Sequence, residues 1–305
     1  MMKILVIGGG GQLGSRIVRY CKQRSFDVYS TYLSRLPALD STHVFLFDKT
    51  DPESVERLVS KIVPDAVIDT AALHNVDYCE THRAEAWRIN VEGTRDVAIA
   101  CRRFRAKMIF ISTDYVFDGN KGNYKEEDPP NPLSHYGVTK LEGEKVVASS
   151  SEDHLIARSS VIYSWVPSQQ ATMSASGKPL NFAGWVVQKL SKGEPIKIVD
   201  DQYSSPTLAD SLAEVLIKAV EKDLKGPYHI AGKTRLSRFG FTLKLAEHMG
   251  FDKDLIVPIK TSELRQIAQR PMDSSLDVSK AEKEIGISLP EIDEALEIFT
   301  RQAKG

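Results

Sequence analysis

The chain has little cysteine, almost no net charge and no metal-ligand spacing. Its three cysteines, Cys21, Cys79 and Cys101, lie far apart without a CxxC motif, so free thiols in a reducing cytoplasm are expected rather than disulfides. The formal net charge of −1 argues against nucleic acid or an anionic membrane surface as the main partner. The seven histidines are scattered along the chain, so no metal site is expected.

Long hydrophobic runs are missing as well. No apolar stretch approaches the roughly 20 residues that a membrane helix needs. The run at residues 4–7 is too short for a signal peptide, and glycines follow it at once. With 42% hydrophobic and 27% charged residues, the composition is typical of a soluble globular protein, and a cytoplasmic location is expected.

Apolar runs alternate with amphipathic segments in the first half of the chain. Strands are predicted over residues 3–8, 28–32, 44–48, 66–70, 107–112 and 154–162. Helices are predicted over residues 12–24, from Pro52 onwards with Asp51 as N-cap, and over 83–103 and 135–149. Parallel strands need such crossover helices, so the pattern predicts an α/β fold with a Rossmann-type, doubly wound parallel sheet.

The second half is less regular and contains a polar, loop-like stretch over residues 167–179. Helices are predicted over residues 181–192, 211–222 and 291–305, short strands over 196–199 and 228–231, and further helices in the remainder. We expect residues 1–160 to form the NAD(P)-binding domain. Residues 161–305 would form mainly a smaller, interleaved substrate-binding domain, with some segments returning to the first.

A Gly-rich turn lies between the first predicted strand and the first predicted helix. Gly8 allows the tight turn, Gly11 lets the backbone approach a pyrophosphate, and Gly14 lets the helix pack close to the strand. The helix that opens at Gln12 and Leu13 offers free N–H groups to the anion. This context predicts dinucleotide binding.

The end of the second predicted strand has no acidic residue to hold the ribose hydroxyls of NAD. Ser34 and Arg35 stand there instead and could bind a 2′-phosphate, which favours NADP(H) over NAD(H) as the cofactor. Asp48, after the third predicted strand, could accept a hydrogen bond from the adenine amino group or act as a helix-capping acid.

Thr113, Tyr136 and Lys140 form the candidate catalytic set. Tyr136 and Lys140 are four residues apart and share one helix face. A nearby ammonium would lower the pKa of the tyrosine, which could donate a proton to a carbonyl oxygen as hydride reaches the carbon. Lys140 could also hold the nicotinamide ribose. Thr113, at the carboxyl end of a strand, could fix the same carbonyl oxygen.

Further motifs extend this pattern over nearly the whole chain. They are Ala71-Ala72 with Val76-Asp77 and Glu80, Ile89-Asn90, Ser112-Thr113-Asp114-Tyr115-Val116-Phe117-Asp118-Gly119, Asp201-Gln202 with Pro206-Thr207, and Arg270-Pro271 with Ser274 and Leu276-Asp277. With them, the chain resembles an extended short-chain dehydrogenase/reductase and is similar to the dTDP-4-dehydrorhamnose reductase family.

The resemblance implies an NADPH-dependent reductase in dTDP-rhamnose biosynthesis that acts on a keto group of a sugar nucleotide, with a dTDP-4-keto-6-deoxyhexose as the leading substrate. It implies Thr113, Tyr136 and Lys140 as catalytic residues. It also implies residues that line the two ligands: Ala71 and Ala72 at the dinucleotide, Asp114, Tyr115 and Val116 at the sugar, and Gln202 and Arg270 on the nucleotide-sugar side.

Two other functions are compatible with the same residues. The regulatory subunit of methionine adenosyltransferase resembles the same family, so a non-catalytic NADP-binding subunit is the second hypothesis. An epimerase or dehydratase of the same fold is the third, although Tyr115 stands where a dehydratase needs a glutamate. The chain departs from the family pattern at residues 161–166 and 203–205, which leaves the sugar nucleotide open, and a homodimer is left open too.

Overall fold

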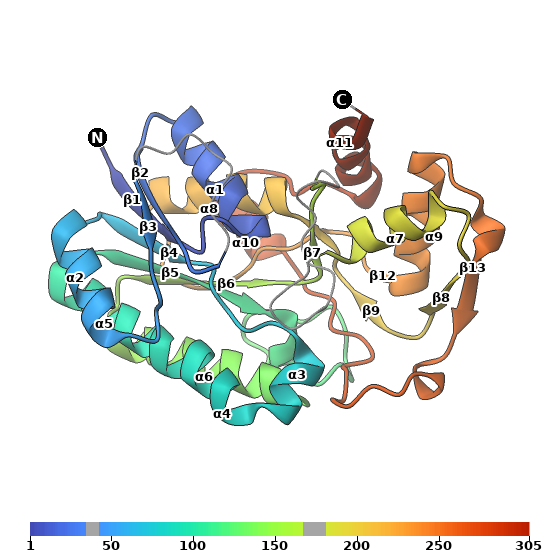
Figure 1. The fold of residues 1–305 in the computed structure, drawn as a ribbon, viewed down its shortest axis with the longest axis horizontal. Helices are drawn as coiled ribbons and strands as arrows, with labels where there is room; N and C mark the ends of the chain where they lie inside the picture. Colours follow the sequence, from blue (N-terminus) through green and yellow to red (C-terminus); the bar gives the residue numbers. More distant parts are fainter. Residues whose placement is uncertain (35–42, 167–180, 305) are drawn as a thin grey trace.

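The computed structural model describes residues 1–34, 43–166 and 181–304. Within them, the central feature is a parallel sheet of seven strands in the order β3-β2-β1-β4-β5-β6-β11 (Figure 1). The strands are β1 Lys3–Ile7, β2 Asp27–Tyr32, β3 Val44–Leu46, β4 Ala66–Asp69, β5 Lys107–Thr113, β6 His154–Ser159 and β11 Gly226–His229. The strand order reverses between β1 and β4, and ligands bind at the carboxyl edge of such sheets at this point. The predicted Rossmann-type fold is confirmed.

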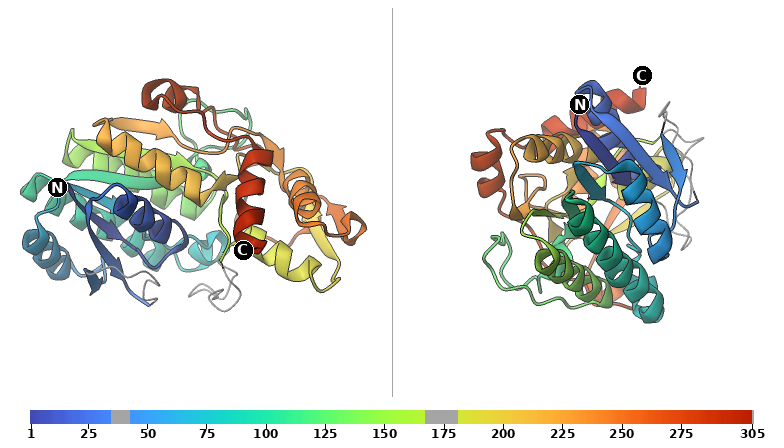
Figure 2. Two further views of the ribbon diagram at one scale, coloured as in Figure 1. Left: turned by 90° about the horizontal axis from the view of Figure 1, so that it is seen from above. Right: turned by 90° about the vertical axis from the view of Figure 1, so that its left-hand side faces the viewer.

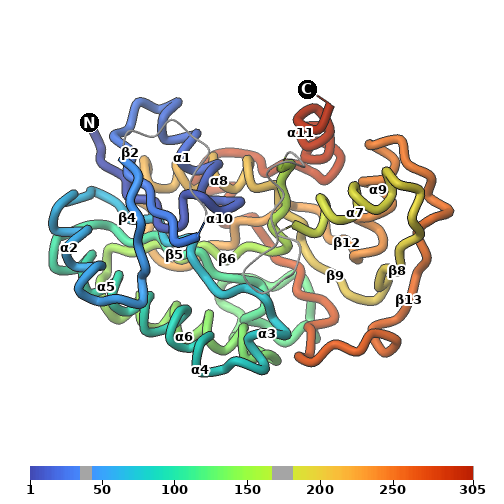
Figure 3. Tube along the Cα trace, viewed as in Figure 1, coloured from blue at the N-terminus to red at the C-terminus, as the bar shows by residue number. Residues whose placement is uncertain are grey.

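Helices cover both faces of the sheet because alternate residues of its strands point to opposite sides. Ile4 and Val6 face a core shared with one group of helices, whereas Leu5 and Ile7 face the core of the other group. The first group is α1 Gln12–Gln23, α8 Ala209–Glu221 and α10 Ser279–Ile285. The second is α2 Pro52–Ile62, α5 Gly93–Phe104 and α6 His135–Ser150. The chain therefore returns to the sheet late, with α8, β11 and α10 (Figure 3).

A further group of helices and short strands lies beside the sheet (Figure 2) and encloses a third hydrophobic core. It is built around Tyr163 and Phe299 from α7 Phe182–Leu190, α9 Arg238–Met249, α11 Ile292–Lys304 and the parallel pair β8 Ile196–Val199 and β13 Ile256–Ile259. Two small pairs connect this part, β7 Ile162–Tyr163 with β10 Thr207–Leu208 and β9 Tyr203–Ser204 with β12 Leu236–Ser237. None of the described helices is both long and apolar enough to cross a membrane.

Several predicted boundaries need correction. The helix expected over residues 83–103 is α4 Arg83–Trp87 and α5, joined by a π-helical turn at Arg88–Glu92, and α3 Val76–Thr81 precedes it. The sixth strand ends at Ser159 because β7 forms a separate pair. The prediction that helices fill the remainder is also wrong, because the Ile-Val-Pro-Ile run of β13 pairs with β8.

Candidate active site

The Gly-rich turn between β1 and α1 has the geometry of a dinucleotide cradle. Gly8 has a φ of +85°, and its carbonyl accepts a 2.9 Å hydrogen bond from the Gly11 N–H. A Cβ on Gly14 would lie only 2.2 Å from the Gly8 oxygen, so α1 approaches the turn as closely as a glycine permits. Because the N-cap is Gly11, which has no side chain, the N–H groups of the first turn at Gln12 and Leu13 can serve an anion. The cradle fits the pyrophosphate of a nicotinamide dinucleotide.

Two of the three residues predicted for the adenosine end of the cofactor, Ser34 and Asp48, lie in the described part of the chain. Ser34 is exposed just after β2, while Arg35 lies outside the described residues. Oδ1 of Asp48 accepts two 2.8 Å hydrogen bonds, from the N–H and the hydroxyl of Thr50. Asp51, not Asp48, caps α2, so Asp48 stabilises the turn before the helix.

Ala71 and Ala72 follow β4, and Ala71 lies against the Gly-rich turn. The hydroxyl of Thr70 donates a 2.7 Å hydrogen bond to the Ile7 carbonyl, which ties the two segments together. A Cβ on Gly8 would lie 3.3 Å from the Ala71 nitrogen. The structure thus brings Ala71 next to the cradle, with Ala72 following it in the chain, and the resemblance implies that both line the dinucleotide.

Thr113, Tyr136 and Lys140 come together at the carboxyl edge of the sheet. Thr113 ends β5, and the other two lie in the first half of α6, whose N-cap Ser134 accepts a hydrogen bond from the helix backbone. The Tyr136 ring meets Tyr115 edge-on at 6.1 Å between centroids. The Lys140 ammonium sits 3.9 Å from the centroid of the Phe110 ring, a cation–π arrangement that holds the buried amine in place.

The ionisation of this set differs from the expectation. Burial raises the pKa of Tyr136 above its ordinary value because desolvation disfavours the phenolate, and the Thr113 hydroxyl opposes this shift only in part. The prediction that Lys140 lowers the tyrosine pKa is therefore wrong. Instead, burial lowers the pKa of Lys140 to about 7, and the positive charge of Lys49 contributes to this shift. Tyr136 is a protonated phenol at neutral pH.

Two residues expected to face the sugar point elsewhere. Asp114 is 2% exposed, and its carboxylate accepts hydrogen bonds from the hydroxyls of Thr113 (3.0 Å), Ser160 (2.7 Å) and Ser274 (2.5 Å). The Val116 side chain is fully buried in the core with α1 and α8, so it packs in the protein interior, and its assignment to the substrate stays a prediction. Of the three, Tyr115 remains partly exposed beside Tyr136.

Arg270 lines a pocket, and Gln202 bonds two other residues of that lining, Thr261 and Gln266. Nε2 of Gln202 donates to Thr261 Oγ1 (3.1 Å) and to Gln266 Oε1 (3.2 Å). Arg270 forms a 2.9 Å salt bridge with Asp77 and is 8% exposed. The pocket has a volume of about 420 Å³, and its lining includes Thr261, Gln266, Arg270 and the apolar Leu133, Leu264, Ile267 and Met272. Arg270 thus borders a pocket, although its guanidinium already has a carboxylate partner.

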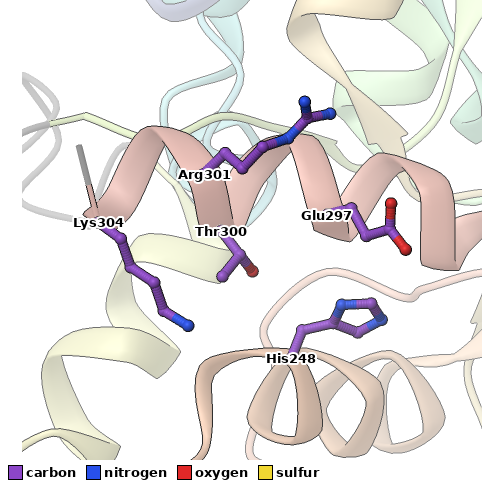
Figure 4. Close-up of a pocket in the computed structure, with 5 residues that line it drawn as sticks. All are labelled: His248, Glu297, Thr300, Arg301 and Lys304. Carbon is purple, nitrogen blue, oxygen red and sulfur yellow. The ribbon is translucent and has the colours of Figure 1, made fainter.

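Another hollow lies between α9 and α11 (Figure 4). Its lining is His248, Glu297, Thr300, Arg301 and Lys304. None of the residues predicted for the cofactor, the substrate or the chemistry lies on these two helices. This hollow is therefore separate from the catalytic set.

A buried polar cluster lies behind residues 71–73; Asn90 belongs to one of the sequence motifs, whereas the pairing of Lys49 with Asp69 was not predicted from the sequence. Lys49 is 5% exposed and Asp69 1% exposed, and their charged atoms are 2.7 Å apart. Asn90, in the π-helical turn, bonds both backbone groups of Leu73. The available signal was a charged residue close behind each of two apolar runs, Lys49 after residues 44–47 and Asp69 after residues 66–68.

The parallel sheet, the glycine cradle and the Thr–Tyr–Lys set define the class of the protein: it is a nicotinamide-dependent oxidoreductase of the extended short-chain dehydrogenase/reductase type. The family model described as "RmlD substrate binding domain" matches residues 2–304. The chain is 33% identical over 296 residues to the "Probable low-salt glycan biosynthesis reductase Agl14" of Haloferax volcanii, which covers 97% of this chain and 96% of the relative.

A second curated relative and a solved structure point to the same family. The dTDP-4-dehydrorhamnose reductase of Aggregatibacter actinomycetemcomitans is 30% identical over 300 residues, which is 94% of each chain. The crystal structure of dTDP-4-dehydrorhamnose reductase from Bacillus anthracis, in complex with NADP, is similar with a TM-score of 0.86 and 29% identity, over 99% of this chain and 100% of that one. The chain belongs to the dTDP-4-dehydrorhamnose reductase family.

Proposed function

We propose that the protein uses NADPH to reduce a keto group of a sugar nucleotide, with a dTDP-4-keto-6-deoxyhexose as the leading substrate and Tyr136 as the proton donor. The observation that carries the proposal is the convergence of Thr113, Tyr136 and Lys140 at the sheet edge that also carries the glycine cradle. The names of the relatives support the substrate class.

The residues divide the work between binding and proton transfer. The bound cofactor supplies the hydride. Tyr136, kept protonated by burial, gives its proton to the oxygen that becomes the hydroxyl. Thr113 holds that oxygen in place, and Lys140 holds the nicotinamide ribose. Ser34 and Arg35 bind the 2′-phosphate.

The pocket that Arg270 lines would bind the sugar nucleotide. Its apolar residues offer contacts for a base or a sugar ring, and Thr261 and Gln266 offer polar groups for orientation. Most of this lining comes from residues 161–305, the part that we assign to substrate binding.

The test is NADPH oxidation with purified protein and a panel of 4-keto-6-deoxyhexose nucleotides. Tyr136→Phe should lower kcat by about 10²-fold or more, the contribution typical of a general acid, while NADPH still binds. Tyr228→Phe is the matched control, because it removes a phenol that bonds Glu284 away from the site. NADPH binding by the wild type without turnover of any keto sugar nucleotide would overturn the proposal and favour a regulatory binding role.

A further inference from the structure

Lys49 is a buried lysine whose ammonium is fully engaged. Its Nζ donates to Asp69 Oδ2 at 2.7 Å, to the Ala71 carbonyl at 2.8 Å and to Thr94 Oγ1 at 3.1 Å. An ammonium has three donors, and here each has an acceptor. Burying a charged pair is costly and gives no reliable gain in stability, so this cluster calls for another explanation.

The cluster clamps the peptide of Ala71 from both sides. Oδ1 of Asp69 accepts a 3.1 Å hydrogen bond from the Ala71 N–H, while Lys49 holds the Ala71 carbonyl. Two residues further on, Asn90 binds the N–H and the carbonyl of Leu73 at 2.9 and 3.0 Å. The segment that lies against the glycine cradle is thus fixed by three side chains: Lys49 from the connection between β3 and α2, Asp69 from β4 and Asn90 from the π-helical turn.

The π-helical turn makes room for this arrangement. It carries Asn90 and is followed by Gly93, where an added Cβ would lie 3.1 Å from both Cγ and Cε of Lys49. The lysine stem therefore passes directly over a glycine. Local π-helical turns are frequent at functional sites, and this one positions the clamp.

The charge of Lys49 also reaches the catalytic set. The Lys140 ammonium lies 3.9 Å from the centroid of the Phe110 ring, and the charges of Lys49, Asp69 and Glu144 act on its pKa. The Lys49 charge disfavours the protonated form of Lys140, whereas the two carboxylates favour it. Asp69 therefore takes part in both interactions: its carboxylate pairs with Lys49 and also raises the pKa of Lys140.

We propose that Lys49 is a positioning residue of the hydride-transfer site, which fixes the Ala71–Ala72 segment against the dinucleotide by holding the Ala71 carbonyl and Asp69. The inference rests on the proposed cofactor site. It requires the ammonium itself, since an apolar side chain of the same length would fill the space but leave the Ala71 carbonyl and Oδ2 of Asp69 without the donor that Lys49 supplies.

The test compares Lys49→Met with Lys49→Arg and with the matched control Lys107→Met. Lys107 is also 5% exposed and paired with two carboxylates, but at the start of β5, the opposite edge of the sheet. The first readout is the Kd of NADPH from fluorescence titration without any keto sugar, so it does not depend on turnover. The second is the pH profile of kcat, and the third is thermal unfolding.

We expect Lys49→Met to weaken NADPH binding by about tenfold, the effect of one lost interaction of 1.4 kcal/mol. Lys49→Arg should restore part of this loss, and Lys107→Met should lower stability while leaving the Kd unchanged. The limb of the pH profile that reports Lys140 should move to higher pH in Lys49→Met, because a neighbouring positive charge is removed.

An unchanged NADPH Kd in folded Lys49→Met would overturn the inference, as would equal Kd changes in Lys49→Met and Lys107→Met. If Lys49→Met does not fold, Lys49→Met/Asp69→Asn removes both charges of the pair, and the same Kd comparison decides. A wild type that binds NADPH but reduces no keto sugar nucleotide would refute the proposed reaction alone, since the Kd comparison would still stand.

Discussion

Gly14→Ala tests the glycine cradle directly. The added methyl carbon would lie 2.2 Å from the Gly8 oxygen, 2.8 Å from the Gly8 carbonyl carbon and 2.9 Å from Gly9 Cα, whereas ordinary contact begins at 3.4 Å. All three obstacles are backbone atoms, so α1 and the turn must separate by about 1 Å. Overpacking of this kind costs about 1–3 kcal/mol of folding stability.

Gly14→Ala should weaken NADPH binding by more than a loss of folding stability alone would. Moving the N-terminus of α1 by this distance removes at least one charge-assisted hydrogen bond to the pyrophosphate, worth about 1.5–3 kcal/mol. The NADPH Kd should therefore rise by about 10- to 100-fold. Isothermal titration calorimetry below the melting temperature of the variant measures this.

Gly184→Ala is the matched control for this experiment. Gly184 is also helical, but an added Cβ would meet nothing nearer than 3.7 Å. It should leave the NADPH Kd unchanged and raise stability by at most about 1 kcal/mol through helix propensity. The reasoning is refuted if folded Gly14→Ala binds NADPH as the wild type does.

Two further predictions concern stability. Arg158→Met breaks a buried bidentate ion pair with Glu144 (2.9 and 2.7 Å). The free energy of unfolding, measured in urea, should fall by about 3–5 kcal/mol. An unchanged urea midpoint would contradict this prediction. Burial lowers the pKa of His229 to about 3, so the unfolded state binds a proton that the folded state does not. Stability should fall by up to about 1.4 kcal/mol per pH unit below 6.5. His229→Gln should flatten that slope between pH 6.5 and 5, and an equally steep slope would contradict the assignment.

Local signals predicted the architecture well because they act over a few residues. The apolar runs of β1, β4 and β5 and the Asp51-Pro52 helix start are visible in short windows. The π-helical turn was missed because its sequence remains compatible with an ordinary helix. Lys49 was missed for another reason: its acceptors lie on Asp69, Ala71 and Thr94, and only the fold brings them to it.

Asp114 shows why the motif over residues 112–119 predicted the position of the site but not the role of each of its residues. Its neighbour Thr113 ends a strand at the site, yet the Asp114 carboxylate turns inward and accepts hydroxyls from Ser160 and Ser274. The Ser160 hydroxyl in turn accepts the Ser205 N–H. Thr113 is therefore anchored, through the buried carboxylate of Asp114, to segments that lie 46 and 160 residues beyond Asp114 in the chain. Adjacency in sequence identified the threonine, whereas its rigidity depends on distant serines that no local pattern connects to it.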